Sequence, residues 1–382
     1  MKTIDAAKKS LLPQGLRDVL PDVAYHEAAV MDGLLSSFRA YGYARVQPPM
    51  VEFEENLLDG PGEAMIPHTF RLMDPVSQKM MGVRADMTPQ VARIAATRLE
   101  SEARPLRLSY GGQVLRVKGT QLRPERQFAQ AGAELIGATS AGGDAEVIAM
   151  AANALLALGV ENLSVDISLP TVVRAIVSDL KLDENQAVEV RQALDRKDAS
   201  AIAAMGGDIA EHFGALLRAS GRAEKAILAL DSITLPAEAQ AERDRLIAVL
   251  EMLKVSAPDV MVTLDAVEHR GFEYQTGLSF TLFAEGVRGE LGRGGRYISA
   301  GSGEEATGVS LYLDSVLRAV PAAISINKLF LPFGTTSEKA VLERAAGWIT
   351  VAGLEFIEDV QSEARRLGCT HILLQDGISA VA

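Results

Sequence analysis

The spacing of apolar residues predicts an alternation of helices and strands in the first part of the chain. Residues 23–41 carry Val30, Leu34, Leu35 and Phe38 at helical spacing, which indicates an amphipathic helix. The segment YARVQPPMVEF then alternates like a strand, but a Pro-Pro pair interrupts it, so it belongs at a sheet edge or a kink. RLMDPVSQKMMGVRAD predicts two strands around an Asp-Pro turn.

Two longer strands and a second helix are expected next. PLRLSYGGQVLRVK and RQFAQAGAELIG both alternate apolar and polar residues, with a polar loop at residues 119–125 between them. GDAEVIAMAANALLALG has helical spacing, opens at Asp144 and is ended by Gly159. NLSVDISL predicts a half-buried strand.

Residues 170–256 differ in character from what precedes them. They are rich in Ala, Leu, Glu, Arg and Lys, with helical periodicity and no convincing strand, which favours an inserted helical subdomain. Strand patterns return in DVMVTLDAV and GLSFTLFAEG, and a glycine-rich stretch leads to a helix expected at residues 309–320. After Pro321 the pattern strand, helix, strand, helix, strand predicts a small α/β unit.

The order of these elements predicts an α+β fold, with an antiparallel or mixed sheet and flanking helices. We expect one domain over residues 1–320, interrupted by the helical insertion at 170–256, and a second, small domain over residues 321–382.

Composition narrows the class of function. The formal net charge of −12 argues against a general nucleic-acid binder. The single cysteine, Cys369, excludes a disulfide within the chain, favours a cytoplasmic location and is expected to be a small buried side chain. Neither a secretory signal nor an apolar run long enough for a membrane span is seen. The five histidines lack metal-ligand spacing, so neither a metal nor another cofactor is expected.

Two segments suggest a polar site. In RADMTPQ, Thr88 is expected to cap a helix, and Asp86 either complements the helix dipole or accepts a ligand ammonium. In RQFAQAGAELIG, even spacing places Gln130 and Glu134 on one face of a strand, where polar groups are costly unless paired or ligand-bound. A salt bridge between Arg116 and Glu134 is the structural alternative to a binding role.

Glycines and tyrosines mark a third polar region. The glycine cluster at residues 289–303 lacks the spacing of a phosphate loop, so it forms either a tight hairpin or the wall of a ligand cavity. EHRGFEYQTG places Arg270 and Tyr274 just before a strand, where a surface turn or a pocket for a small zwitterion would account for them.

In this order, the segments resemble the catalytic core of histidyl-tRNA synthetase, a class II aminoacyl-tRNA synthetase, over residues 12–320. YGYARVQPPMVEFEE is similar to motif 1, VRADMTPQVAR to the RPExT segment, residues 116–137 to motif 2, and RGFEYQTG to the histidine-recognition segment RGLDYYTG. GRGGRY and TGVSLYLDSVLRAV match the glycine hairpin and motif 3. The chain resembles most the shortened members of this family that act as regulatory subunits of ATP phosphoribosyltransferase.

The resemblance implies a histidine pocket in which Glu134 and Gln130 contact the ligand and Arg270 binds its carboxylate. The matching positions are Asp86, Thr88, Arg116, Gln130, Glu134, Arg270, Tyr274, Gln275 and Tyr297. Gln275 departs from the family pattern, in which the second tyrosine of the recognition segment occupies this position.

The resemblance also implies that the ATP site is degenerate. Lys118 replaces a motif 2 glutamate, Ser315 replaces the motif 3 arginine that holds the triphosphate, and Tyr312 replaces a small residue beside the adenine. Loss of a positioned arginine removes stabilisation of transferring phosphates. The segment after Pro321 is shorter than the family's anticodon-binding domain, so tRNA recognition is not expected.

The resemblance therefore predicts a non-catalytic subunit without aminoacylation activity. Its implied partner is a short-form ATP phosphoribosyltransferase, in a hetero-octamer that contains homodimers of this chain, with histidine as feedback ligand in the first step of histidine biosynthesis. Two alternatives are an ATP-dependent ligase that forms an aminoacyl-adenylate for a target other than tRNA, and a truncated tRNA-binding module.

Overall fold

The computed structural model describes residues 11–58, 60–120, 123–268, 275–322 and 327–381. The chain divides into two compact units, Met1–Pro321 and Ala322–Ala382, and each is described by itself.

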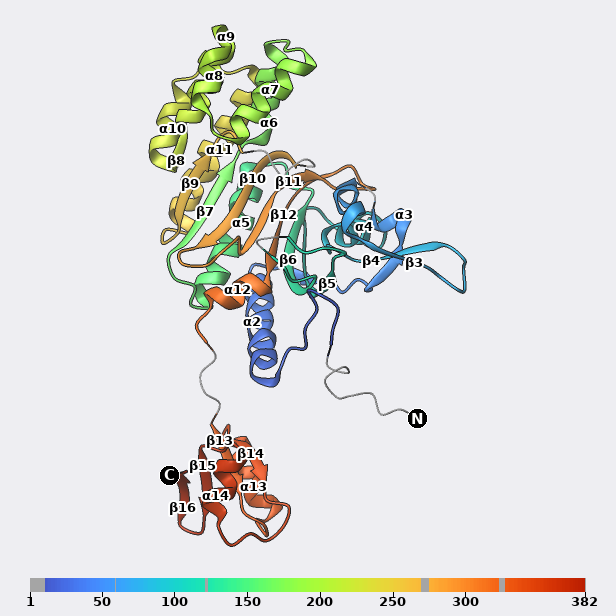
Figure 1. Ribbon diagram of the computed structural model, residues 1–382, viewed down its shortest axis with the longest axis vertical. Helices are drawn as coiled ribbons and strands as arrows, with labels where there is room; N and C mark the ends of the chain where they lie inside the picture. Colours follow the sequence, from blue (N-terminus) through green and yellow to red (C-terminus); the bar gives the residue numbers. More distant parts are fainter. Residues whose placement is uncertain (1–10, 59, 121–122, 269–274, 323–326, 382) are drawn as a thin grey trace. The chain divides into compact units, whose positions relative to one another are not determined.

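The first unit is built on a nine-stranded mixed sheet in the order β1-β5-β6-β12-β11-β10-β7-β9-β8 (Figure 1). Its pairs are antiparallel except β1–β5 and β7–β9, which are parallel. The strands are β1 (Ala44–Arg45), β5 (Leu106–Leu115), β6 (Gln127–Ile136), β7 (Leu163–Ser168), β8 (Ser220–Arg222), β9 (Met261–Asp265), β10 (Gln275–Ala284), β11 (Gly292–Ile298) and β12 (Glu305–Tyr312). The predicted α+β class is confirmed by this arrangement and by the structural relatives given below.

Helices cover one face of the large sheet and bury the main core. Val30, Leu34, Leu35 and Phe38 of α2 are buried there, as their spacing predicts. The helices of this layer are α2 (Pro21–Ala40), α5 (Ala141–Ala157), α11 (Ala237–Ser256) and α12 (Leu313–Ala319).

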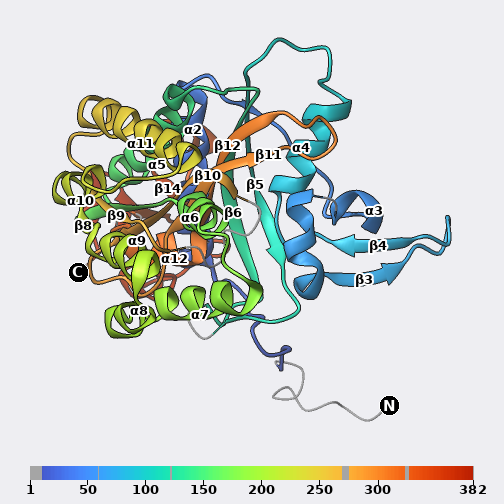
Figure 2. The same cartoon turned by 90° about the horizontal axis from the view of Figure 1, so that it is seen from above.

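The opposite face carries a smaller core and a second sheet. Met87, Tyr110, Phe128 and Tyr297 belong to this core. A three-stranded sheet in the order β2-β4-β3 projects beyond this side of the unit (Figure 2). The elements here are β2 (Val51–Phe53), α3 (Glu54–Leu57), the 3-10 helix η1 (Gly60–His68), β3 (Phe70–Met73), β4 (Met80–Val83) and α4 (Thr88–Thr97).

Residues 170–256 form mainly helices at the β7–β9–β8 edge of the sheet. Before α11 come α6 (Pro170–Asp179), α7 (Glu184–Asp195), α8 (Ala199–Met205), α9 (Gly207–Arg218) and α10 (Ala223–Asp231). The sequence predicts no strand in this insertion, but β8 pairs with β9 and extends the main sheet. Gly221, at a φ of 115°, lies in β8, and so short and glycine-containing a strand gives no alternating pattern.

Three other expectations are corrected. The strand expected across the Pro-Pro pair is two strands in different sheets, β1 and β2. The helix expected at residues 309–320 begins at Leu313, because Val309–Tyr312 belong to β12, between β11 and β6. The helix expected to open at Asp144 begins at Ala141, and Asp144 is fully buried within its first turn.

The second unit is a four-stranded sheet in the order β14-β13-β15-β16 with α13 and α14 on opposite faces. Its elements are β13 (Lys328–Leu331), α13 (Ser337–Ala345), β14 (Ile349–Ala352), α14 (Val360–Arg366), β15 (His371–Leu374) and β16 (Gly377–Ala380). The final strand, β16, is absent from the sequence prediction. Cys369 is buried beside Phe330 and Ile372, as expected for a lone thiol.

Candidate functional site

The candidate site lies on the face of β6 that turns away from the main core. Side chains alternate along a strand, and here Ala131, Ala133 and Leu135 enter the main core while Gln130 and Glu134 point to the other side. The alternation predicted from the sequence is therefore confirmed, and it places two buried polar side chains in the interior of the sheet.

Glu134 is held by two tyrosine hydroxyls. Tyr110 on β5 donates to Oε1 at 3.1 Å and Tyr297 on β11 donates to Oε2 at 2.8 Å. Burial raises the pKa of Glu134 to about 8, although the hydroxyls of Tyr297, Thr88 and Tyr110 oppose the shift. The carboxyl group is therefore largely protonated at neutral pH. A salt bridge to Arg116, the structural alternative, is not what satisfies it.

Gln130 is fully occupied by protein groups. Its Nε2 donates to Asp86 Oδ2 at 3.2 Å and to Ser310 Oγ at 2.8 Å, and its Oε1 accepts from the backbone of Met87 at 3.1 Å. An amide nitrogen has two hydrogens, so both are used. Gln130 thus orients Asp86 and Ser310 around the site.

Thr88 does not cap the helix as expected. It is the first residue of α4, its backbone N–H donates to Asp86 Oδ1 at 2.9 Å, and its hydroxyl lies 3.1 Å from the Tyr110 hydroxyl. The side chain that satisfies the start of the helix is therefore Asp86, which leaves the Thr88 hydroxyl directed at the site.

Tyr110 and Ser310 are functional candidates that the sequence does not reveal. Their hydroxyls lie 3.0 Å apart, and both belong to strands that flank Gly132 on β6. A Cβ at Gly132 would lie 2.3 Å from the Tyr110 hydroxyl, so the glycine makes room for the ring. Gly132, between Gln130 and Glu134, is the feature of the sequence that could have indicated a large side chain packed against this strand.

Glycines form the wall opposite Glu134. A Cβ at Gly308 would lie 1.8 Å from Glu134 Oε2, and a Cβ at Gly295 would lie 2.6 Å from Gln275 Oε1. These residues line a cavity of about 20 Å³, which suffices for a water molecule. The lining residues include Thr88, Glu134, Gln275, Gly295, Tyr297, Gly308 and Ser310. The glycine stretch thus serves both as a hairpin and as a cavity wall.

Gln275 lines the same cavity and is buried, with 2% of its surface exposed to solvent. Its Oε1 is buried and has no hydrogen-bond partner within the described part of the chain. An unpaired buried carbonyl is costly, so a ligand N–H placed beside it would be favourable. Arg270 and Tyr274, its predicted neighbours in the pocket, lie outside the described residues.

Arg116 faces a different cavity, of about 520 Å³, next to the Glu134 site. Its Nε donates to the Ala85 carbonyl at 3.3 Å and its guanidinium lies over the Phe128 ring at 5.1 Å. Lys118 and Ser315 also line this cavity. The structure therefore separates Arg116 from the other predicted histidine contacts and groups it with the predicted ATP-site residues.

Two of the predicted ATP-site residues, Tyr312 and Ser315, are bound to other protein groups. Tyr312 is buried, meets Phe128 edge-on and lies 3.8 Å beneath the guanidinium of Arg123. Arg123 also pairs with Asp314 at 3.1 Å. Ser315 Oγ accepts a hydrogen bond from Arg318 at 2.9 Å. Arg123 and Arg318 are thus bound to protein groups, and Lys118 is exposed where it lines the cavity.

A metal site is not formed by the described residues, where no three His, Cys, Asp or Glu side chains converge suitably. The helices within the described ranges include none that is both long enough and apolar enough to cross a bilayer.

Comparison with known proteins identifies the class and then the family. The family model for histidyl-tRNA synthetase matches residues 15–316. A solved ATP phosphoribosyltransferase regulatory subunit/histidyl-tRNA synthetase from Bacillus halodurans C superposes with a TM-score of 0.80 at 25% identity, covering 93% of this chain and 96% of its own. The chain is therefore a histidyl-tRNA synthetase-like protein of the class II fold.

Two relatives named ATP phosphoribosyltransferase regulatory subunit are more similar still. The one from Paramagnetospirillum magneticum is 55% identical over 377 residues, 99% of both chains. The one from Rhodospirillum centenum is 54% identical over 363 residues, 95% of this chain and 94% of its own. This chain belongs to the family of ATP phosphoribosyltransferase regulatory subunits.

Proposed function

We propose that this chain is a non-catalytic regulator of an ATP phosphoribosyltransferase catalytic chain in the first step of histidine biosynthesis. The observation that carries this proposal is the 55% identity to a regulatory subunit over nearly the full length of both proteins. The contacts of Tyr312 and Ser315 support it, because they occupy the region where a synthetase would bind ATP.

Free histidine is the proposed ligand of the Glu134 cavity. Asp86, bonded to Gln130 and Thr88 beside the cavity, is an acid suited to a cationic group of histidine, and Glu134 would become one on losing its proton. The unpaired Oε1 of Gln275 is an acceptor for an N–H group. Tyr297 and Thr88 complete the polar lining. Arg270 and Tyr274 are the further contacts implied by the family resemblance.

The size of the cavity bears on how histidine would regulate. A space of about 20 Å³ is smaller than an amino acid, so histidine would have to move the walls on entering. A ligand that binds one arrangement of the walls better than another shifts the population between them. This is the physical basis that we propose for feedback inhibition.

The proposed assembly is a hetero-octamer of four regulatory and four catalytic chains, with the regulatory chains paired as homodimers. Leu20, Val23 and Tyr25, around the start of α2, are 69%, 47% and 67% exposed. Such an exposed apolar group supports a contact surface in this region. The net charge of −12 speaks against tRNA as a partner, and the lone buried cysteine supports a cytoplasmic location.

The test mixes the purified chain with a short-form ATP phosphoribosyltransferase that lacks its own regulatory domain. We expect the two proteins to co-purify, the rate of phosphoribosyl-ATP formation to change on mixing, and histidine to inhibit the complex. Glu134→Gln should weaken inhibition at least about tenfold while co-purification persists.

Glu251→Gln is the matched control, because Glu251 is an exposed acid paired with Lys254 on α11 and should leave inhibition unchanged. Absence of both co-purification and a rate effect would refute the regulatory role. Equal inhibition of the wild type and Glu134→Gln would instead place histidine elsewhere.

A further inference from the structure

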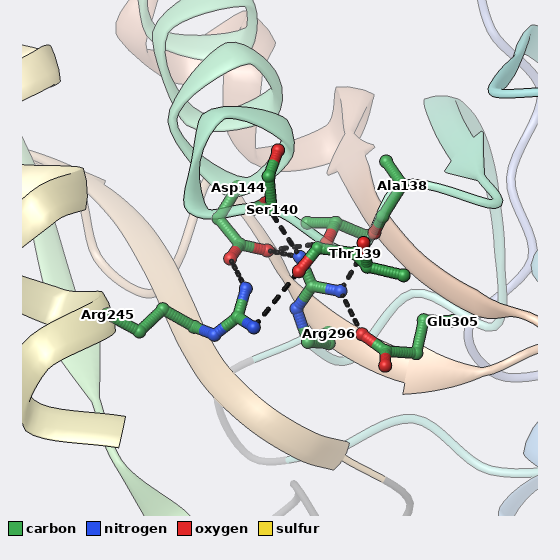
Figure 3. Close-up of polar contacts among 8 residues, drawn as sticks. Ala138, Thr139, Ser140, Asp144, Arg245, Arg296 and Glu305 are labelled. Carbon is green, nitrogen blue, oxygen red and sulfur yellow. Dashed lines mark hydrogen bonds and ion pairs between the residues drawn. The ribbon is translucent and has the colours of Figure 1, made fainter. Parts of the chain in front are cut away.

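The strands that form the walls of the Glu134 cavity are held from behind by a buried ionic network. Tyr297 on β11 and Gly308 on β12 face the cavity, so their neighbours Arg296 and Thr307 point to the opposite face of the sheet. Both neighbours bind the same carboxylate, that of Asp144 on α5. Figure 3 shows the contact of Arg296 with this carboxylate. The position of the cavity wall thus depends on what holds Asp144.

Asp144 is completely buried, and its carboxylate has three side-chain partners among the described residues. Arg296 Nη2 lies 2.9 Å from Oδ1, the Thr307 hydroxyl donates to Oδ1 at 2.6 Å, and Arg245 Nη1 lies 3.2 Å from Oδ2. Arg296 also donates to the Ala138 carbonyl at 2.9 Å and to Glu305 at 2.7 Å. A buried carboxylate of this kind is stable only while its cations stay in place.

Arg245 is the one member of this network that the helical insertion supplies. It lies on α11, and besides Asp144 it binds the Thr139 carbonyl, at 3.0 Å, through Nη2 (Figure 3). Burial raises the pKa of Glu242, and the Arg245 guanidinium opposes this shift. Without Arg245, the neighbouring carboxyl groups of Asp144 and Glu242 would both lose a nearby positive charge.

The insertion makes a second contact with the cavity wall. Arg174 on α6 donates to the backbone carbonyl of Gln275 at 2.8 Å. Gln275 begins β10, where it pairs with Tyr297 ahead of a register shift that ends at Ser279. The inserted helices therefore contact the backbone of β10 and the ionic support of β11 and β12, three of the four strands that line the cavity.

We propose that Arg245 is a positioning residue for the histidine pocket, and that through it the helical insertion and the pocket are coupled. The proposal rests on the proposed function for the identity of the ligand. Histidine that displaces Tyr297 or Gly308 must displace Arg296 and Thr307 with them, and hence Asp144 and α11. Coupling of this kind is reciprocal, so fixing the insertion also changes the affinity for histidine.

The test uses the full-length chain and compares Arg245→Met with Arg243→Met. Arg243 lies on the same helix, but its acidic partners Asp231 and Asp244 belong to the insertion itself. Without ligand, amide hydrogen exchange in β11 and β12 should be faster in Arg245→Met than in the wild type and unchanged in Arg243→Met. Calorimetry with L-histidine should show about tenfold weaker binding for Arg245→Met alone.

Arg245→Lys keeps a cation beside Asp144 and should recover part of the affinity, which a loss of overall stability would not do. It also replaces Arg245→Met if the latter does not fold. The proposal is overturned if neither Arg245→Met nor Arg245→Lys changes hydrogen exchange in β11 and β12. It is also overturned if the wild type binds histidine and neither of these two variants binds it more weakly. If exchange is altered in Arg245→Met but the wild type does not bind histidine, the proposed ligand is refuted, whereas the role of Arg245 in positioning the strands is supported.

Discussion

Burial determines the protonation state of Glu134, the acid in the cavity that we propose for histidine. Its pKa of about 8 lies well above the value of 4.5 expected in an unfolded chain. Between these two values the folded protein holds a proton that the unfolded protein has lost. Stability contributed by this group is therefore present below pH 4.5 and is lost as the pH rises through 8.

Glu134→Gln should remove this pH dependence. The free energy of unfolding of the wild type, measured in urea, should fall relative to that of the variant by roughly 3 kcal/mol from about pH 5 to about pH 8. The amide does not titrate, so the variant lacks this decline. Parallel curves for the two proteins would show that Glu134 is ionised in the folded state at neutral pH.

Gly308→Ala should disturb the cavity from the opposite wall. The added methyl group would lie 1.8 Å from Glu134 Oε2, so either Glu134 leaves Tyr297 or the strands separate. We expect a loss of about 1–3 kcal/mol in unfolding free energy and at least about a tenfold loss of histidine affinity. Gly142→Ala is the control, because its methyl group would meet only Ser140, at 3.5 Å, and should be neutral in both measurements.

At this scale the sequence predicts which residues face the site better than what they contact. Even spacing places Gln130 and Glu134 on one face, and the structure agrees. Their partners could not be predicted in the same way, because Tyr110 and Ser310 reach Gln130 and Glu134 through strand pairing between distant segments. A long-range register has no local signature.

Among the elements, the junction of β12 and α12 carries two of the residues that the family resemblance assigns to a degenerate ATP site. Tyr312 ends the strand beneath Arg123, and Ser315 in the first turn of the helix accepts a hydrogen bond from Arg318. The family resemblance implies that a synthetase carries a triphosphate-binding cation at this position, where this chain has the Ser315 hydroxyl. Tyr312 and Ser315 can be read directly from the sequence, but the sequence pattern predicts the start of α12 at residue 309, four residues before its actual start at Leu313.

This junction predicts that the chain does not activate histidine. Pyrophosphate exchange with ATP and histidine should remain at the background level of a protein-free reaction. A purified histidyl-tRNA synthetase assayed in parallel provides the positive control. Exchange well above background would revive the adenylate-forming alternative.

In the whole molecule, the two units have separate cores. Leu329, Phe330, Leu331 and Ile372 are buried within the second unit, and the Glu134 cavity is lined only by residues of the first. The strand and helix pattern after Pro321 is clear in the sequence, since each element is short and bounded by turn residues.

A chain that ends at Pro321 should therefore fold and keep its affinity for histidine within about threefold, because no cavity residue is lost. Circular dichroism and calorimetry on the shortened and full chains test this. Failure of the shortened chain to fold, or a large loss of affinity, would mean that the second unit supports the first.

The short strand β8 determines what kind of motion the inserted helices can make. Its pairing with β9 ties the middle of the insertion to the last position of the nine-stranded sheet, while α6 and α11 tie its two ends. A subdomain fastened at three points cannot swing open as a lid does. A signal that reaches it must travel as a small tilt shared with the edge of the sheet, so a probe placed on β8 would report occupancy of a cavity whose nearest strand, β10, lies three positions away in the sheet.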